Sequence, residues 1–148
     1  MTVIAWDGTT LAADKQCTNN GYKTTVTKIY RFDDGRLVGA ASHSHICVAF
    51  IEWLRRGGNI PDILKSAKEE KVAGAGIEIL PNGKIHRYQI GVSSIPLHFE
   101  DKFIAIGSGF EYAVGAMAMG ADAIKAVEIT SRFSSSCGMG VDSLRLNE

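Results

Sequence analysis

Three short turn sequences each stand between two runs of strand-forming residues, and they constrain the fold more than any other feature of the chain. The turns are Asp7-Gly8, Asp33-Asp34-Gly35 and Pro81-Asn82-Gly83. An Asp-Gly or Asn-Gly turn between two such runs is typical of an antiparallel hairpin. Because each strand pairs with its neighbour in sequence, helices do not alternate with strands. The pattern therefore predicts an α+β fold with antiparallel sheets, and it argues against a doubly wound parallel sheet.

Helices are expected in two groups, between and after the hairpins. Apolar residues recur at helical spacing over residues 45–56, with Ser42 or Ser44 as the expected cap. A shorter helix over residues 60–70 begins at Ile60-Pro61-Asp62, and residues 15–25 are expected to form a loop. The other expected helices are 108–119 and 122–133, and the expected strands are 2–6, 9–13, 26–32, 36–41, 72–80, 84–90, 95–99, 102–106 and 137–146.

Length and composition fit a single globular domain over residues 1–148. The chain is 45% hydrophobic and 22% charged, and its formal net charge of zero gives no reason to expect nucleic-acid binding. No apolar run approaches the roughly 20 residues that span a bilayer, and residues 1–8 lack the features of a secretory signal. Cys17, Cys47 and Cys137 form no CxxC pair and no metal-ligand spacing with histidine. We therefore expect a soluble cytoplasmic protein with no cofactor, no metal and no membrane partner.

Thr2 is the first candidate for chemistry. Initiator methionine is commonly removed before a small residue, and removal of Met1 would put a hydroxyl and a free α-amine on Thr2. An α-amine has a reference pKa of about 7.7–8.0, so it can act as a base near neutral pH. A threonine hydroxyl becomes a useful nucleophile when such a base takes its proton. Position alone favours the simpler interpretation, a threonine that begins a strand.

Three further polar residues lie at the ends or edges of expected strands. Asp14 ends the run Leu-Ala-Ala-Asp, where a carboxylate is usually a turn residue or a cap. A lone lysine in a strand, such as Lys28, normally faces solvent. If Lys28 pointed inward near Thr2, its charge would disfavour protonation of the Thr2 amine, and Asp14 could be its partner. Ser108 forms a capping box with Glu111, which gives it a structural role whether or not it touches a site.

The order of these residues resembles that of proteasome β-subunits and the HslV peptidase, and most closely their shortened members in bacteria and phages. The similarity runs from residue 2 to about residue 146. Its most specific parts are Leu-Ala-Ala-Asp at 11–14 and Ile-Ala-Ile-Gly-Ser-Gly at 104–109. The other matching segments are Thr-Val-Ile-Ala at 2–5, Lys-Ile at 28–29, Leu-Val-Gly-Ala-Ala at 37–41 and Cys-Gly-Met-Gly-Val-Asp at 137–142.

The resemblance implies the four-layer αββα sandwich of N-terminal-nucleophile hydrolases, with helices outside two antiparallel sheets. It implies a threonine peptidase or amidohydrolase, in which Thr2 attacks an amide carbonyl and forms an ester that water hydrolyses. Lys28 matches the lysine that tunes the threonine, Asp14 its acidic partner and Ser108 the serine beside the nucleophile. The backbone N–H that binds the oxyanion is placed at Ala41. Peptide or unfolded-protein substrates and a homo-oligomeric ring are also implied, and the absence of a GxxxxGK[ST] pattern makes any ATP-dependent unfoldase a separate chain.

Three departures from the family pattern keep other functions open. The hairpin from Thr2 to Asp14 is shorter by roughly four residues, an even change that would keep side chains on their faces. The glycine-rich turn of the family is replaced by Ala41-Ser42-His43-Ser44-His45. Ser134 stands where an aspartate is expected, and Cys137 where a serine is expected. A non-catalytic assembly subunit or a decoy of a host protease fits these changes, and a hydrolase of a small amide fits the same fold.

Overall fold

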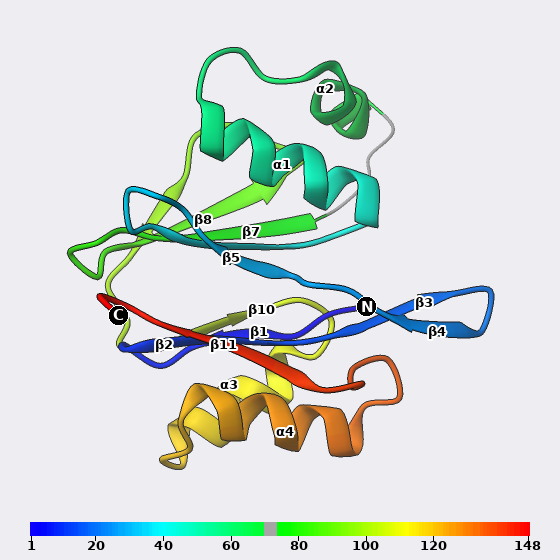
Figure 1. Cartoon of the computed structure of the whole chain (residues 1–148), viewed down its shortest axis with the longest axis vertical. Helices are drawn as coiled ribbons and strands as arrows, with labels where there is room; N and C mark the ends of the chain where they lie inside the picture. Colours follow the sequence, from blue (N-terminus) through cyan, green and yellow to red (C-terminus); the bar gives the residue numbers. More distant parts are fainter. Residues whose placement is uncertain (70–73) are drawn as a thin grey trace.

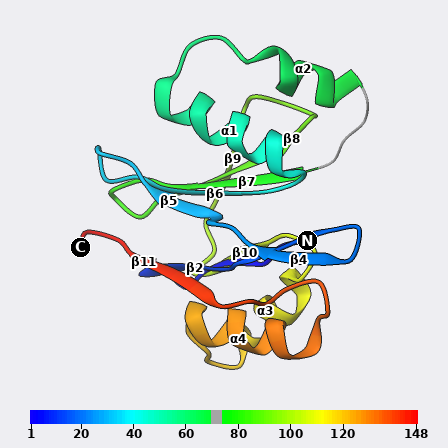
Figure 2. The same ribbon diagram turned by 45° about the vertical axis from the view of Figure 1, so that its right-hand side comes forward.

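A computed structural model of the chain describes residues 1–69 and 74–148. Its elements form four stacked layers: two helices, a five-stranded sheet, a four-stranded sheet and two further helices (Figure 1). The layers remain stacked when the molecule is turned, and the N-terminus lies at one side of the sandwich, at the level of the two sheets (Figure 2). The arrangement confirms the predicted α+β fold with helices outside two antiparallel sheets.

The four-stranded sheet contains the N-terminal hairpin and runs in the order β10-β1-β2-β11. Every neighbouring pair in it is antiparallel. Trp6 lies opposite Leu11, and the turn between them is held by Asp7, whose Oδ1 accepts the N–H groups of Thr9 and Thr10. The hairpin predicted at Asp7-Gly8 is therefore present. The strands are β1 (Ile4–Trp6), β2 (Thr10–Asp14), β10 (Ile104–Ile106) and β11 (Val141–Arg145).

The five-stranded sheet is a meander of antiparallel neighbours in the order β5-β6-β7-β8-β9. The two remaining predicted turns, at residues 33–35 and 81–83, connect β5 to β6 and β7 to β8. The strands are β5 (Ile29–Arg31), β6 (Leu37–Ala41), β7 (Gly74–Ile79), β8 (Ile85–Ile90) and β9 (Leu97–Phe99).

Two pairs of helices cover the outer faces of the sheets. α1 (Ser44–Arg56) and α2 (Asp62–Glu69) lie over the five-stranded sheet, and α3 (Phe110–Ala118) and α4 (Ala123–Phe133) lie under the other sheet (Figure 1). Among the described residues, no helix is long and apolar enough to cross a membrane.

The alternation of side chains along β1 shows how the layers are held together. Ile4 and Trp6 belong to the core between the two sheets, whereas Val3 and Ala5 pack in the core with α3 and α4. Successive strand residues point to opposite faces of a sheet, so a strand that is buried on both faces has a continuous apolar sequence. The segment that follows Thr2 is thus fixed by packing on both sides.

A two-stranded hairpin occupies residues 15–25, where a loop was expected. β3 (Gln16–Asn19) and β4 (Tyr22–Thr25) pair with each other and with neither sheet. Between them, Asn20 and Gly21 have φ values of 51° and 80°, which a two-residue hairpin turn of the Asn-Gly type requires. Most side chains of this hairpin are exposed. Because neither of its faces has to be apolar, its sequence lacks the alternation that predicts a strand.

The serine caps predicted for α1, at Ser42 or Ser44, and for α3, at Ser108, are both wrong. The residue before α1 is His43 and the residue before α3 is Gly109, and neither makes a side-chain capping hydrogen bond. The hydroxyl of Ser44 instead lies 3.6 Å from the Cys17 sulfur, and that of Ser108 bonds to Thr2. A hydroxyl engaged with a distant segment is not available to cap its own helix.

The ends of the other elements differ from expectation by a few residues. The largest difference is at β11, which begins at Val141 and not at residue 137. The predicted parts of elements at residues 70, 72 and 73 lie outside the described residues.

Candidate active site

Thr2 is held in place by the turn that joins β10 to α3. Its backbone N–H donates to Ser108 Oγ at 3.2 Å, and its carbonyl accepts the N–H of Gly109 at 3.1 Å. The residue is 7% exposed, although Met1 before it is 70% exposed. The structure therefore brings Thr2 and Ser108, which are 106 positions apart, into direct contact.

Asp14 is fully buried at the end of β2 and is surrounded by donors. Its Oδ1 accepts the Lys28 ammonium at 2.8 Å and the N–H of Val3 at 3.1 Å. Its Oδ2 accepts the N–H groups of Gly138 at 3.0 Å and Gln16 at 3.3 Å. A buried carboxylate is tolerated where it is paired and hydrogen-bonded, and these four donors satisfy both oxygens.

Lys28 points inward, as the resemblance requires. It lies just before β5, its side chain is 8% exposed, and its ammonium also donates to the Met1 carbonyl at 2.9 Å. The two contacts place the ammonium between Asp14 and the peptide unit that precedes Thr2. A positive charge at this place would disfavour protonation of a Thr2 α-amine.

The N-terminal hairpin places Asp14 beside Val3, the residue that follows Thr2. Asp14 N–H donates to the Val3 carbonyl at 3.2 Å, in addition to the bond from Val3 N–H to the Asp14 carboxylate. Had the hairpin been shortened by an odd number of residues, Asp14 would face the opposite side of the sheet. The sequence prediction that these residues converge therefore holds, while their catalytic roles stay predictions.

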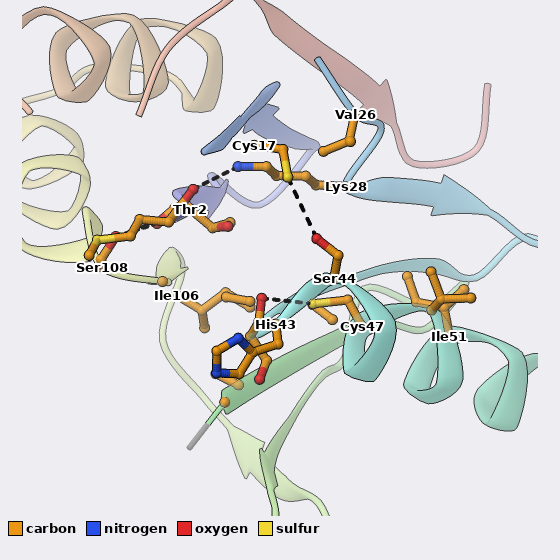
Figure 3. A pocket seen from close by; sticks show the side chains of 18 of the residues that line it. Thr2, Cys17, Val26, Lys28, His43, Ser44, Cys47, Ile51, Ile106 and Ser108 are labelled. Atoms are coloured by element: carbon orange, nitrogen blue, oxygen red, sulfur yellow. Dashed lines mark hydrogen bonds between the residues drawn. The ribbon is translucent and has the colours of Figure 1, made fainter. Parts of the chain in front are cut away.

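An open cleft of about 1490 Å³ lies beside Thr2. Figure 3 shows Thr2, Lys28 and Ser108 on one side of it and His43, Ser44 and Cys47 on the facing side. Side chains of β3, the start of α1 and the segment before α3 complete its walls. A cleft that is bounded by several elements and contains convergent polar groups is the usual setting of a binding site.

Ala41, the proposed oxyanion donor, is the last residue of β6 and lines this cleft. Ser42 follows it, and its carbonyl is 3.5 Å from the Cys47 sulfur on α1. Burial raises the pKa of the Cys47 thiol, so the thiol stays protonated and can donate. The segment that contains Ala41 is thus fixed to the helix that follows it.

The turn from β6 into α1 is exposed at His43, Ser44 and His45. The rings of His43 and His45 lie 6.1 Å apart, and both residues are exposed. Within the described residues, no group of three or more His, Cys, Asp or Glu side chains could hold a metal ion. The two histidines are therefore surface residues at the mouth of the cleft.

Ser134 and Cys137 are the residues that the resemblance aligns with an aspartate and a serine. The Ser134 hydroxyl lies 2.9 Å from that of Ser136, so it is engaged within its own turn. Cys137 is 3% exposed; its burial, followed by the negative charge of Asp14, raises the pKa of its thiol. A buried neutral thiol is a poor nucleophile.

Several backbone groups of the site were missed by the sequence analysis. The N–H groups of Gly138 and Gln16 bind Asp14, and that of Gly109 binds Thr2. Gly107 is also required, because a Cβ atom there would lie 2.2 Å from the Thr2 carbonyl oxygen. Backbone donors carry no side-chain signal, and the two glycines around Ser108 are the one feature of the sequence that is typical of a close approach between segments.

Two antiparallel sheets between two pairs of helices form the four-layer αββα sandwich that the resemblance implies. No protein-family model and no curated protein matches the sequence. Among solved structures, BPH of Thiobacillus denitrificans matches with a TM-score of 0.74 and 21% identity over 99% of this chain and 97% of that one. The same protein in complex with epoxomicin matches with a TM-score of 0.73 and 22% identity over 100% of both chains. HslV from Trypanosoma brucei matches with a TM-score of 0.70 and 18% identity over 99% of both.

These similarities identify the particular fold. The chain has the fold of HslV and the proteasome β-subunits, so the resemblance stated from the sequence is confirmed at the level of the fold. At such sequence identities the fold alone is established, and activity has to be argued from the site.

Proposed function

We propose that the protein is a threonine-type peptidase or amidohydrolase that uses Thr2 as its nucleophile after Met1 has been removed. The observation that carries this proposal is the convergence of Thr2, Asp14, Lys28 and Ser108 beside one open cleft. These residues come from four separate segments of the chain. A structural copy of the fold would not need to bury a lysine–aspartate pair next to the second residue.

In this proposal the α-amine of Thr2 takes the proton from the Thr2 hydroxyl, which attacks a substrate carbonyl carbon. The negative charge that forms on the carbonyl oxygen is stabilised by backbone N–H, for which Ala41 is the candidate. Loss of one such donor typically costs a factor of about 10²–10³ in rate. The amine of the substrate then leaves with the proton, and water hydrolyses the resulting Thr2 ester.

The other charged and polar groups prepare the nucleophile. The Lys28 ammonium favours the neutral, basic form of the amine, and Asp14 compensates the lysine charge inside the protein. Ser108 Oγ, now bonded to the Thr2 nitrogen, is placed to orient the amine that this nitrogen would become. Each group thus has one role in the same proton transfer.

The cleft supports peptides or unfolded proteins as substrates, because it is open and extends from β3 to α1. The proposal also includes a homo-oligomeric ring, a separate ATP-dependent unfoldase and a cytoplasmic location. Only the family resemblance supports these three features. A small amide as substrate would suit a monomer with the same open cleft.

A non-catalytic role, as an assembly subunit or a decoy, is favoured by one observation. The resemblance aligns Ser134 with an aspartate of the family, and the Ser134 hydroxyl pairs with that of Ser136 within its own turn. Retention of the buried pair of Lys28 and Asp14 argues against this alternative.

The test is the intact mass of the untagged protein before and after reaction with a peptide epoxyketone. Epoxomicin, the ligand in the complex of Thiobacillus denitrificans BPH, is a suitable probe. We expect loss of the Met1 mass and one adduct that disappears in Thr2→Ala. Thr27→Ala is the matched control, because Thr27 is a threonine that lines the same cleft. A processed chain that never forms the adduct would support the non-catalytic alternative.

A further inference from the structure

Three consecutive residues at the junction of β2 and β3 bind the segment that leads into β11. This segment, residues 134–138, contains neither helix nor strand. Asp14 Oδ2 accepts the Gly138 N–H at 3.0 Å, and the Lys15 N–H donates to the Gly138 carbonyl at 3.0 Å. Both of these contacts reach the last residue of the segment. A third contact, from the side chain of Gln16, reaches its middle.

The amide group of Gln16 is buried and held at two points. The residue is 3% exposed, and its Nε2 donates to the Ser135 carbonyl at 3.1 Å and to the Thr18 hydroxyl at 3.0 Å. A side-chain amide has two N–H donors, so these two bonds use both of them. Gly138 packs against the same amide, because a Cβ atom there would lie 3.2 Å from Gln16 Oε1. One side chain of β3 therefore contacts the segment at both Ser135 and Gly138.

The local bonds of the segment do not attach it to the sheet. The Ser134 hydroxyl lies 2.9 Å from that of Ser136, and the Cys137 N–H donates to the Ser134 carbonyl at 3.4 Å. These bonds shape the turn but leave its position open. Cys137 is buried in the core with α3 and α4, and apolar packing is non-directional. Among the described residues, Gln16 is the side chain that connects the middle of the turn to β3.

The position of this segment matters to Asp14. The Asp14 carboxylate is fully buried, and the Gly138 N–H is one of its donors. A buried charge needs its donors at fixed positions, since a lost hydrogen bond leaves it poorly compensated. Asp14 also accepts the Lys28 ammonium at 2.8 Å. A displacement of residues 134–138 would therefore shift the charged pair that lies beside Thr2.

We propose that Gln16 is a positioning residue of the Thr2 site, whose amide holds residues 134–138 where the Gly138 N–H binds Asp14. The catalytic consequence rests on the proposed function, whereas the placement of the segment does not. Gln16 acts through the buried charged pair and not on the substrate. Without the amide the segment moves, and the pair moves with it. A displacement of about 1 Å at a reacting group can cost on the order of 10²-fold in rate.

The experiment compares the full chain with Gln16→Met, in which the side chain keeps nearly its length but has no N–H donor. Protection of the Gly138 amide from hydrogen exchange, measured by NMR, should fall about 10-fold, because loss of an anchoring hydrogen bond eases local opening. The maximal rate of epoxyketone labelling at Thr2 should fall about 10- to 100-fold. The probe concentration that gives half of this rate should stay unchanged, since Gln16 presents almost no surface to the cleft.

A second variant disturbs the same contact from the other side. Gly138→Ala places a methyl group 3.2 Å from Gln16 Oε1, at a φ of +154° that favours glycine. We expect it to lower the protection of residue 138 and the maximal labelling rate in the same way. Ser131→Ala is the matched control, because it removes a bond of the same kind within α4, from the Ser131 hydroxyl to the Val127 carbonyl at 2.8 Å. Its exchange and labelling should match those of the original chain.

Three outcomes would overturn the proposal. They are unchanged protection of residue 138 in both variants, lower protection with an unchanged maximal labelling rate, and a change in the half-saturating probe concentration alone, which would place Gln16 in substrate binding. Failure of the original chain to form the adduct would instead count against the proposed function and end the catalytic part of this proposal. The exchange measurement does not depend on peptidase activity, so it would still decide whether Gln16 holds the segment.

Discussion

Two buried carboxylates with basic partners lie in different layers of the molecule, and only one of them is beside the cleft. Asp14, the last residue of β2 in the four-stranded sheet, is fully buried and pairs with Lys28. Glu78 on β7 is 4% exposed and pairs with Arg36 at 2.8 Å. By burial and charge the two sites are nearly equivalent, so these properties alone do not mark a functional site.

The donors around the two carboxylates differ in kind. Asp14 accepts three backbone N–H groups from separate segments besides Lys28. Within residues 1–69 and 74–148, the donors to Glu78 are side chains, those of Arg36, His86 and Tyr88. A carboxylate bound by backbone groups fixes the path of the chain, and here it fixes the residue next to Thr2. Glu78 instead connects β7, β8 and, through Arg36, the last turn of α1.

The alternation along β8 explains why the second site is separate from the cleft. Arg87 and Gln89 line the cleft, whereas His86 and Tyr88 point to the other face of the sheet, toward the helices. Side chains two residues apart share a face of a strand. The Glu78 group therefore stabilises the outer layer, and the Asp14 group is positioned to act on Thr2.

The largest effect is expected from Lys28→Met, which would leave the Asp14 carboxylate buried without its cation. Removal of one partner of a buried pair typically destabilises by about 3–5 kcal/mol. We expect a loss of this size in the free energy of unfolding, measured by urea denaturation, together with loss of epoxyketone labelling at Thr2.

Lys15→Met is the control for this prediction. Lys15 pairs with Asp142 at 2.7 Å, but their side chains are 26% and 33% exposed, and exposed pairs contribute only about 0–1 kcal/mol. The double variant Lys28→Met, Asp14→Asn should recover part of the stability, since no unpaired charge remains. If Lys28→Met and Lys15→Met were equally stable, the Asp14 pair would not have the role assigned to it.

A smaller effect with a different pattern is expected from Glu78→Gln. The amide keeps the shape of the side chain but weakens the bonds from Arg36 and His86, at a cost of about 1–3 kcal/mol. The rate of epoxyketone labelling at Thr2 should stay unchanged, since distant sites with no shared partners act independently. A parallel loss of labelling would mean that the two networks are coupled and that the comparison is wrong.

The fold was predictable from the sequence because its signals are local. Each of the three hairpin turns needs only two or three residues, and the apolar runs around them were buried as expected. β3 and β4 were not predicted because their polar sequence shows no apolar alternation, although Asn20-Gly21 is typical of a hairpin turn.

The sequence predicted which side chains form the candidate site, but not the backbone groups that hold them. The convergence of Thr2, Asp14 and Lys28 followed from the family resemblance, and the structure shows the contacts. The donors from Gly109 and Gly138 could not be predicted, because every residue has a backbone N–H and only the tertiary path decides which one is used. The capping box predicted at Ser108 did not form, because the Ser108 hydroxyl accepts the N–H of Thr2, which is distant in the sequence.

The smallest expected effect concerns Tyr88 and alkaline pH. Burial, together with the nearby Glu78 charge, raises the pKa of Tyr88 well above its ordinary value. The folded state then keeps the proton above about pH 10, where the unfolded chain loses it. Stability from this group is therefore fully present below about pH 10 and is lost as pH rises above that point toward the folded pKa.

Tyr88→Phe should remove this dependence while costing only about 0.5–1.5 kcal/mol at neutral pH for the lost hydrogen bond. Urea midpoints measured from about pH 8 to about pH 11 should fall more steeply in the original chain than in the variant. Tyr30→Phe is the matched control, since its hydroxyl donates at the surface to the Thr27 carbonyl and does not contact Glu78. An unchanged fall of the urea midpoint with pH in Tyr88→Phe would mean that Tyr88 and Glu78 are open to solvent above about pH 10. The burial of Glu78 would then not match that of Asp14 at alkaline pH.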